Sequence, residues 1–455
     1  MKITVIGGGS YLWTPLLVND VLLSERLRNV QLYLFDINEN NLQDMNKLSL
    51  MVKESLHSDV TIKSTMNIDE ALDGSDFVIV QIAVGGFDAM KYDLEIPSKY
   101  GIYQSVGDTV GPGGMARGIR NALVFMDYAR RIDKLCPKAW VINLTNPLTI
   151  LSRVFNLSGI KVVGLCHEVG ESIERLSKLF EISQNDFEYD VIGINHLPWI
   201  TNMKIKGDNG FNLLRKYIEN GKYDDTFINN STNPYISKMQ VAKELFNIFE
   251  VFPAASDRHI CEFFPYFLRD VNFKKLEGEY KVRLTTINRR KAERKKLIEF
   301  YKNILNKELK MFKKSYKPHK SGENVIEVID SIYNGRNENF VADVPNDGAI
   351  KQLPLNVVVE TKVSFKNGKI NLLSPQSQYI PNNLLGILME HITNQEEVVK
   401  ATFERNRKKA FTAFINDPLT SVLPLKSIKD MFNELWDFSM NEKWVFPPYH
   451  IGKNP

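Results

Sequence analysis

Residues 1–200 alternate short apolar runs with longer amphipathic stretches. Apolar residues at helical spacing predict helices at about 14–28, 39–56, 114–135, 148–157 and 171–182. Five runs rich in Val and Ile, bounded by Gly, Asn or Asp, are typical of buried strands: Lys2–Ile6, Gln31–Phe35, Phe77–Ile82, Trp140–Leu144 and Lys161–Leu165. Strands and helices that alternate in this way predict an α/β fold with a Rossmann-like doubly wound parallel sheet.

The alternation is lost after about residue 205, where the remaining pattern predicts a mixed α+β segment. Polar residues at 219–233 indicate a loop or an insertion. Further elements are expected as helices at about 236–250 and 275–318, strands at 357–363 and 370–373, and helices at 381–415 and 425–436. We therefore expect two connected domains, a sheet domain at 1–200 and a mixed α+β domain at 201–455 that covers the binding edge of the sheet and takes part in oligomerisation.

Composition places the chain among ordinary globular proteins. Of its 455 residues, 43% are hydrophobic and 25% charged, and the net charge of +4 is weak evidence for a polyanionic partner. No stretch approaches the roughly 18 apolar residues of a membrane span, and Met1-Lys2 leads directly into the first strand. Three scattered cysteines do not form a disulfide framework. We expect a cytoplasmic protein that binds neither membrane nor nucleic acid.

One densely basic segment, residues 288–320, could be interpreted as a nucleic-acid surface. Glu293, Glu299 and Glu308 interleave with its cations, as on the solvated face of a helix. We therefore interpret this segment as a solvated helix.

The first strand ends in a glycine turn that predicts a dinucleotide site. Gly7, Gly8 and Gly9 supply the first two glycines of the G-x-G-x-x-G pattern, although Leu12 stands where the third would fall. The second strand ends at Asp36, whose carboxylate can accept hydrogen bonds from both ribose hydroxyls and repel a 2′-phosphate. The prediction is NAD rather than NADP. The alternative is a strand-to-helix turn that binds no phosphate.

Polar side chains follow two later apolar runs at the same predicted sheet edge. Cys166 and His167 come after one run, and Asn195 and His196 after the other. A lone Cys at a strand end is usually a small buried apolar residue. A thiolate together with an imidazole would leave positions open on a divalent ion, which is typical of a catalytic rather than a structural metal site.

With these residues in view, the chain resembles the NAD- and manganese-dependent glycosidases of glycoside hydrolase family 4. The likeness covers most of the chain, and the sheet half of that family is similar to lactate and malate dehydrogenases. It is carried by Gly7–Gly9, Asp108–Gly114, Asn143–Pro147, Gly164–His167, Gly193–His196, Phe252–His259 and Asn346–Pro354.

The resemblance implies a reaction in which NAD oxidises C3 of a sugar and thereby acidifies the proton on C2. A base then removes that proton, the C1 substituent is eliminated, water adds, and the hydride returns to C3. Members of this family are exceptions to hydrolysis by two carboxylates. A divalent metal, Mn²⁺ or another, would stabilise the developing oxyanion.

The resemblance also implies roles for individual residues. Cys166 and His196 match the metal ligands, and Asn146 matches a substrate-binding residue. Asp257 falls at the position of the base for C2, His167 at that of the proton donor to the leaving oxygen, and Asp108 at an acidic position that tunes the base. His259, two residues after Asp257, is the next candidate base. Without the resemblance, Asn146 is equally typical of a tight turn before Pro147. Asp108 and Asp257 are equally typical of an acidic loop residue or of a residue that caps a helix.

Substrate preference is predicted from the residues after Cys166. Phosphosugar members carry Asn or Asp there, whereas this chain has Cys-His-Glu-Val at 166–169, which resembles α-glucuronidases. We expect a small-molecule, non-phosphorylated α-glucuronide, with Glu168 on sugar hydroxyls and Arg258 on the uronate. The alternatives are an α-galacturonidase, an α-glucosidase or an α-galactosidase, and, outside the family, a 2-hydroxy acid dehydrogenase or a non-catalytic NAD sensor. The family also suggests a homodimer or a homotetramer.

Overall fold

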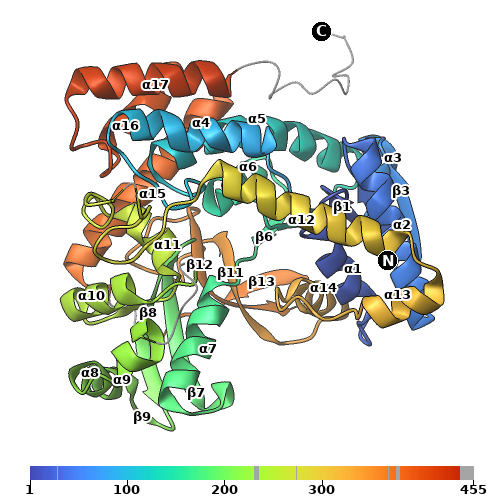
Figure 1. Ribbon diagram of the computed structural model, residues 1–455, viewed down its shortest axis with the longest axis horizontal. Helices are drawn as coiled ribbons and strands as arrows, with labels where there is room; N and C mark the ends of the chain where they lie inside the picture. Colours follow the sequence, from blue (N-terminus) through green and yellow to red (C-terminus); the bar gives the residue numbers. More distant parts are fainter. Residues whose placement is uncertain (28, 230–234, 273, 367, 376–379, 441–455) are drawn as a thin grey trace.

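A computed structural model describes residues 1–27, 29–229, 235–272, 274–366, 368–375 and 380–440. Its centre is one continuous sheet, which joins the two halves of the chain (Figure 1). The first half of the chain contributes the strands β1 (Lys2–Ile6), β2 (Gln31–Phe35), β3 (Thr61–Thr65), β4 (Phe77–Val80), β5 (Trp140–Asn143) and β6 (Lys161–Gly164).

These six strands are parallel and lie in the order β3-β2-β1-β4-β5-β6. This is the strand order of the Rossmann fold, which confirms the predicted fold class. The five predicted strands are present within one or two residues of their expected ends. The pattern missed β3 because its polar residues alternate with a single buried position, Ile62.

Helices cover both faces of the parallel sheet because successive strand residues point to opposite sides. In β4, Ile79 packs into the core under α1 (Thr14–Leu22) and α2 (Glu39–Leu56), and Val78 into the core on the opposite face. The remaining helices of this half are α3 (Ile68–Leu72), α4 (Gly86–Lys99), α5 (Gly111–Leu135), α6 (Leu148–Leu157) and α7 (Glu168–Phe180).

The second half extends the same sheet with antiparallel strands. β11 pairs with β6, with Asp343 opposite Gly164, and the sheet continues through β12, β7, β8 and β10. β8 contains residue 200, so the sheet runs through the expected domain boundary, and the division into domains stays a prediction. These strands are β7 (Phe187–Ile194), β8 (Leu197–Ile205), β9 (Asp208–Asn209), β10 (Phe252–Pro253), β11 (Asn339–Pro345), β12 (Val358–Lys366) and β13 (Lys369–Leu372).

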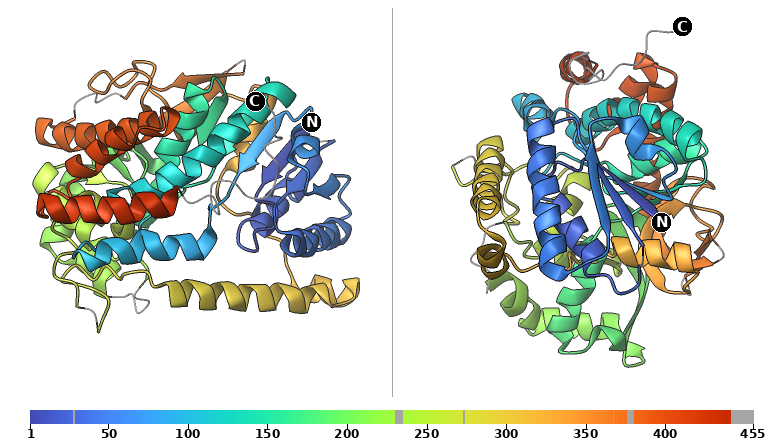
Figure 2. Two further views of the ribbon diagram at one scale, coloured as in Figure 1. Left: turned by 90° about the horizontal axis from the view of Figure 1, so that it is seen from above. Right: turned by 90° about the vertical axis from the view of Figure 1, so that its right-hand side faces the viewer.

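The later helices pack on both halves of the sheet and against the helices of the first half (Figures 1 and 2). Three short segments, Gln184–Asp186, Asp225–Asn229 and Cys261–Phe263, form single 3₁₀ or π turns. The α-helices are α8 (Gly210–Glu219), α9 (Lys222–Asp224), α10 (Gln240–Phe249), α11 (Asp257–Ile260), α12 (Ile287–Leu305), α13 (Leu309–Ser315), α14 (Val325–Asn334), α15 (Asn382–Phe403), α16 (Arg407–Asn416) and α17 (Leu425–Ser439).

Two helices are shorter in the structure than the sequence pattern predicts. The helix expected at 14–28 ends at Leu22, because the Ser24 hydroxyl accepts the N–H groups of Arg26 and Leu27 and turns the chain. The helical pattern at 275–318 becomes α12 and α13, and α12 starts only where Thr286 caps it. The stretch expected as a loop at 219–233 carries α9 and a π turn up to Asn229, and residues 230–233 lie outside the described residues.

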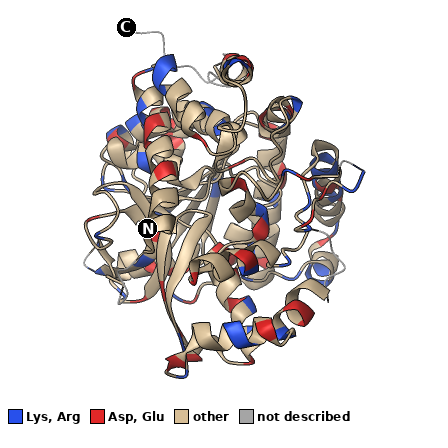
Figure 3. Cartoon of the chain, turned by 90° about the vertical axis from the view of Figure 1, so that its left-hand side faces the viewer, with Lys and Arg blue, Asp and Glu red and all other residues tan. Residues whose placement is uncertain are grey.

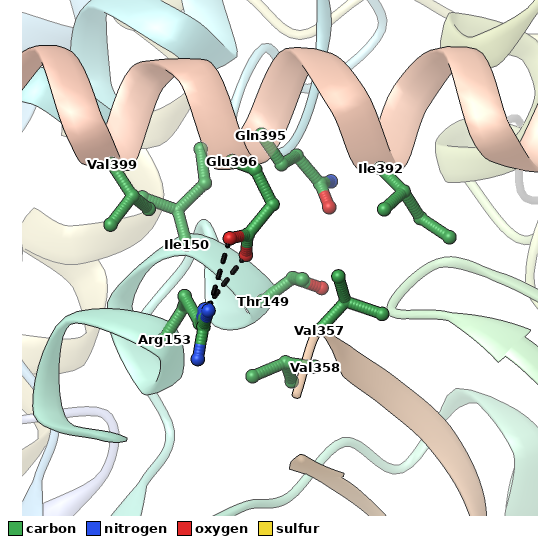
Figure 4. Close-up of a pocket in the computed structure, with 9 residues that line it drawn as sticks. All are labelled: Thr149, Ile150, Arg153, Val357, Val358, Ile392, Gln395, Glu396 and Val399. Carbon is green, nitrogen blue, oxygen red and sulfur yellow. Dashed lines mark hydrogen bonds and ion pairs between the residues drawn. The ribbon is translucent and has the colours of Figure 1, made fainter. Parts of the chain in front are cut away.

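The helix α15 ties the end of the chain to the sheet. It lies across α6 and the start of β12, and Arg153 and Glu396 join it to α6 through hydrogen bonds of 2.8 and 3.2 Å (Figure 4). None of the helices in the described part of the chain is long and apolar enough to cross a membrane.

A buried ion pair joins α4 to α5 behind the carboxyl edge of the sheet. Arg120 donates to both oxygens of Asp93 at 3.0 and 2.7 Å, and the side chains are 2% and 0% exposed. Asp93→Ala leaves this guanidinium buried without its partner, so we expect it to lower the free energy of unfolding by about 3–5 kcal/mol. Asp127→Ala, which removes partly solvent-exposed pairs with Arg130 and Arg131, should cost about 1 kcal/mol or less. Chemical denaturation of both variants tests this, and equal losses would contradict it.

Candidate active site

The glycine turn after β1 has the geometry of a dinucleotide-binding loop. Gly7 has a φ of 98°, and a Cβ there would collide with the carbonyl oxygen of Gln81. The N–H groups of Gly7 and Gly8 both reach the carbonyl oxygen of Phe35, at 2.9 and 2.7 Å. The turn is therefore held tightly against the end of β2, and α1 begins five residues after Gly9.

Asp36 stands at the end of β2, beside this turn. Its carboxylate accepts the N–H of Gly9 and that of Asn38, both at 2.8 Å. Burial raises the pKa of Asp36, and the nearby charge of Arg294 on α12 opposes this effect. Helix α12 thus brings a cation from the second half of the chain to the predicted dinucleotide site.

Three side chains form a cluster at the same edge of the sheet: Asp108, His196 and His259. The rings of the two histidines stack with centroids 3.7 Å apart, and Nδ1 of His259 lies 3.8 Å from Oδ1 of Asp108. One ligand atom from each of the three residues lies within 4.8 Å of the others. Burial alone would raise the pKa of Asp108, but His259, Arg117 and His196 lower it to about 2.

The orientation of His196 leaves one ring nitrogen free. This residue has a φ of 66° in the two-residue turn between β7 and β8. Its Nδ1 lies 2.6 Å from the hydroxyl of Thr109, which in turn donates to Asp108 at 2.9 Å. Because the Thr109 hydroxyl donates to Asp108, its oxygen accepts a hydrogen bond from His196. We therefore assign the proton of His196 to Nδ1 and the lone pair to Nε2. Burial, and then the charge of His259, lower the pKa of His196 to about 3, so the ring is neutral at pH 7.

Cys166 follows β6 and lies next to a group of buried polar side chains. Burial raises the pKa of its thiol well above the usual value, and the charges of Glu360 and Glu168 add to this effect. Asp343 and Glu360 face each other across β11 and β12, and both are at most 1% exposed. No carboxylate oxygen of this pair, and neither polar atom of the Asn195 side chain, has a hydrogen-bond partner among the described residues.

Glu168 and Asn146 also belong to this site. Oε2 of Glu168 accepts the N–H of Ser256 at 2.5 Å, and Oε1 lies 3.7 Å from Nε2 of His259. The Asn146 side chain donates to Asp108 at 3.4 Å. Of the expected site residues, Cys166, His196, Asn146, Glu168 and Asp108 therefore lie close to one another.

Two other expected residues are committed to backbone groups outside this cluster. The carboxylate of Asp257 accepts the N–H groups of Gln240 and Ala242 at 2.7 and 3.1 Å, so it caps α10. Burial raises its pKa to about 6. The guanidinium of Arg258 donates to the carbonyl oxygens of Ser105 and Arg283 and to the hydroxyl of Thr285, so it is committed to loop backbone rather than free for a carboxylate.

His167 lies at the rim of the site. Its side chain is 49% exposed, and Nδ1 lies 3.2 Å from Glu323, which precedes α14. This contact with Glu323 raises the pKa of His167 to about 9, so the ring is protonated at neutral pH. The structure therefore places a cationic ring beside the buried cluster.

Two parts of the site were not among the main predictions from the sequence: His259 was only the alternative base, and Asp343 and Glu360 had no role. His259 stood only two residues from Asp257, and the choice between them required the orientation of α11. Asp343 and Glu360 carried a local signal, since an ionisable residue inside an apolar strand is unusual. That signal does not say which carboxylates meet, because the pairing of β11 with both β6 and β12 decides it.

Comparison with known proteins matches most of the chain to a single family of enzymes. Residues 2–182 match the profile of family 4 glycosyl hydrolases, and residues 191–420 match that of the family's C-terminal domain. An α-galacturonidase of Thermoanaerobacterium saccharolyticum is 34% identical over 96% of this chain and 95% of its own. An α-galactosidase of Bacillus subtilis is 29% identical over 98% and 99%.

Solved structures agree in fold. The protein lplD of Bacillus subtilis superposes with a TM-score of 0.84 at 29% identity, covering 96% of this chain and 99% of that one. A 6-phospho-α-glucosidase from gut microorganisms, in complex with NAD and Mn²⁺, gives 0.79 at 20% identity over 97% and 98%. A malate dehydrogenase of Plasmodium falciparum with NADH gives 0.50 at 14% identity over 89% and 99%. The chain belongs to family 4 of the glycosyl hydrolases.

Proposed function

We propose that this protein hydrolyses α-galacturonides with the help of NAD and a divalent cation such as Mn²⁺. The observation that carries the proposal is the likeness to α-galacturonidases along nearly the full length of both chains. The preference for an α-glucuronide rested on the tetrapeptide 166–169, and its α-galacturonidase alternative now has the better support. A homodimer or a homotetramer stays a prediction.

The residues fit a divalent cation at Cys166 and His196. Nε2 of His196 is unprotonated, and Cys166 offers a sulfur ligand once its proton leaves. The buried carboxylate of Glu360 lies close to Cys166, and the buried side chain of Asn195 directly precedes His196, so both suit a site that gains a positive charge. One imidazole and one thiolate leave several positions of the cation open to oxygen ligands such as sugar hydroxyls and water, which Mn²⁺ favours.

The glycine turn and Asp36 fit NAD. The backbone of Gly7–Gly9 can approach a pyrophosphate, and Asp36 can accept from both ribose hydroxyls. When bound, NAD would accept and return the hydride of C3, and the cation would polarise the oxygens on C2 and C3.

Within this scheme His259 is our candidate for the base that takes the proton from C2. Its two ring nitrogens lie 3.8 Å from Asp108 and 3.7 Å from Glu168, so both carboxylates can stabilise the imidazolium that forms. Asp257, the candidate implied by the family resemblance, would first have to release the N–H groups at the start of α10.

His167 is the candidate acid for the leaving oxygen. It lies at the rim, where an aglycone would leave, and Glu323 holds its ring in the cationic form. Asn146, tied to Asp108, would hold a sugar hydroxyl next to the cation.

The reaction is tested with three 4-nitrophenyl substrates, the α-galacturonide, the α-glucuronide and the α-galactoside, assayed with NAD, Mn²⁺ and a reductant. We expect kcat/KM for the galacturonide to exceed the other two by at least about 100-fold, because each rival leaves buried polar groups of the site unpaired. NADH should not accumulate, since the hydride returns to C3.

Each alternative gives a different result in this assay. Preference for the galactoside would favour the second candidate function, supported by the α-galactosidase relative. Preference for the glucuronide would restore the prediction from the tetrapeptide. In a separate assay with lactate or malate as the substrate, absorbance at 340 nm that rises in step with product would indicate a dehydrogenase.

A further inference from the structure

Three arginines from different elements converge beside the candidate active site. They are Arg117 on α5, Arg258 on α11 and Arg290 in the first turn of α12, and together we call them the arginine cluster. Arg258 donates to the hydroxyl of Thr285 at 2.6 Å, just before the first turn of α12, which carries Arg290, and the charge of Arg290 lowers the pKa of both other arginines. Arg117 is in turn close enough to Asp108 to lower the pKa of that carboxyl.

The hydrogen bonds of the cluster show which arginine is free. Arg258 is committed to the loop that leads into α12, through Thr285 and two carbonyl oxygens. Arg117 donates its Nε to the carbonyl oxygen of Asn146 at 3.1 Å, which keeps the rest of its guanidinium available. The backbone N–H of Arg290 donates to the carbonyl oxygen of Thr286, and within the described part of the chain no hydrogen bond or ion pair is found for its half-buried side chain.

The neighbours of Arg290 on α12 differ from it. Arg289 pairs with Glu293 at 2.7 Å, and Lys291 pairs with Asp88 at the start of α4 at 2.9 Å. Elsewhere on the molecule Lys and Arg alternate with Asp and Glu along the helices (Figure 3). Arg290 thus lies between two paired cations, and its own charge acts on Arg117 and Arg258.

The acids near the cluster are already engaged. Asp93 is held by Arg120, and Glu262 accepts the N–H groups of Val106 and Gly107. Asp108 is shared with Thr109 and the histidines. Convergent guanidinium groups without matching carboxylates repel each other, and a bound anion would relieve that repulsion.

We propose that Arg290, assisted by Arg117, binds the carboxylate at C6 of a uronide substrate, and this inference rests on the proposed function. A guanidinium matches the two oxygens of a carboxylate in a fork that a neutral hydroxymethyl group cannot use. Arg258 takes no direct part and instead positions the loop before α12. The cluster therefore selects a galacturonide over the corresponding galactoside.

The test compares Arg290→Gln with the wild-type enzyme on a matched pair of substrates, the 4-nitrophenyl α-galacturonide and α-galactoside. Lys295→Gln is the control, because it removes the same charge from an exposed position on the same helix. We expect Arg290→Gln to lower kcat/KM for the galacturonide by about 10- to 100-fold, mainly through KM, and to change that for the galactoside less than about threefold. Arg290→Lys should recover part of the loss.

Binding of free galacturonate and galactose, measured by isothermal titration calorimetry, does not depend on turnover. It is compared among variants whose melting temperature matches that of the wild-type enzyme. Arg290→Gln should weaken galacturonate binding alone, and Lys295→Gln should weaken neither. An unchanged ratio between the two sugars in Arg290→Gln would overturn the inference and leave the proposed function intact. If the wild-type enzyme does not cleave the galacturonide, the proposed function fails, and the galacturonate affinities still decide whether Arg290 binds a uronate.

Discussion

Cys166→Ser is expected to abolish stable binding of a divalent cation and to lower kcat/KM by at least about 10³-fold. The thiol follows β6 at the edge of the sheet where Nε2 of His196 is free. The charge of the buried Glu168 acts on the pKa of both residues. A serine hydroxyl is a poor substitute, because it does not become an anionic ligand near neutral pH as a metal-bound thiol does. Activity should also depend on a reductant that keeps Cys166 reduced.

Metal analysis of the purified variant, together with activity after chelation and addition of Mn²⁺, checks this expectation. Chelator should abolish turnover by the wild-type enzyme, and Mn²⁺ with dithiothreitol should restore it. Cys136→Ser is a matched control, because Cys136 is buried at the end of α5 in the core between the sheet and its helices. Near-normal metal content and turnover in Cys166→Ser would show that the cation is held elsewhere.

His259→Gln is expected to lower kcat by about 10²- to 10⁴-fold, the range for loss of a general base, while NAD and cation binding persist. Glutamine keeps a side chain of similar reach but cannot take the C2 proton. Asp257→Asn should act differently, because the amide can replace only one of the two oxygens that cap α10. Its main effect should be a loss of about 0.5–2 kcal/mol in stability.

Hydrolysis in D₂O distinguishes a base from a residue that only supports the fold. Removal of the C2 proton should place deuterium at C2 of the released sugar, which mass spectrometry and NMR detect. The wild-type enzyme should also exchange C2–H, and His259→Gln should lose exchange and hydrolysis together. If Asp257→Asn instead loses both while staying folded, Asp257 is the base. Product without label at C2 would argue against deprotonation by any residue.

Much of the parallel sheet followed from local pattern. Runs such as Lys2–Ile6 and Gln31–Phe35 are apolar on both sides because helices cover both faces of the sheet, so their signal is strong. The site candidates could also be predicted in outline, since ligands bind at the carboxyl ends of parallel strands. Asp36 and Cys166 therefore stood out as the first polar residues after apolar runs.

The antiparallel half was harder to predict. β11 carries polar residues on its exposed part, and it pairs with β6 and β12, strands separated from each other by almost 200 positions of sequence. Pairing over such distances depends on the complementary faces of strands that local pattern does not connect. The facing of Asp343 and Glu360 beside Cys166 could not be inferred before that pairing was known.

Tertiary structure also decided the direction of side chains within single motifs. Asp257, Arg258 and His259 are adjacent in sequence, yet the first caps α10, the second holds the loop before α12, and the third stacks on His196. One short helix turns successive residues by about 100° each, so neighbours must face different surroundings. The sequence could indicate that this segment contributes to the site, but not which of its three residues faces the other site residues.

By itself, the sequence determined the Rossmann-like sheet, the glycine turn with Asp36, and the presence of Cys166 and His196 at one sheet edge. These features depend on local apolar pattern and on strand ends, which each segment specifies on its own. Only the tertiary structure decided that His259 joins His196 and Asp108, that Asp257 and Arg258 bond to backbone groups, and that α12 brings the charge of Arg290 close to Arg117 and Arg258. These relations depend on the packing of α11 and α12 against the sheet, and packing is a property of the whole chain rather than of any one segment.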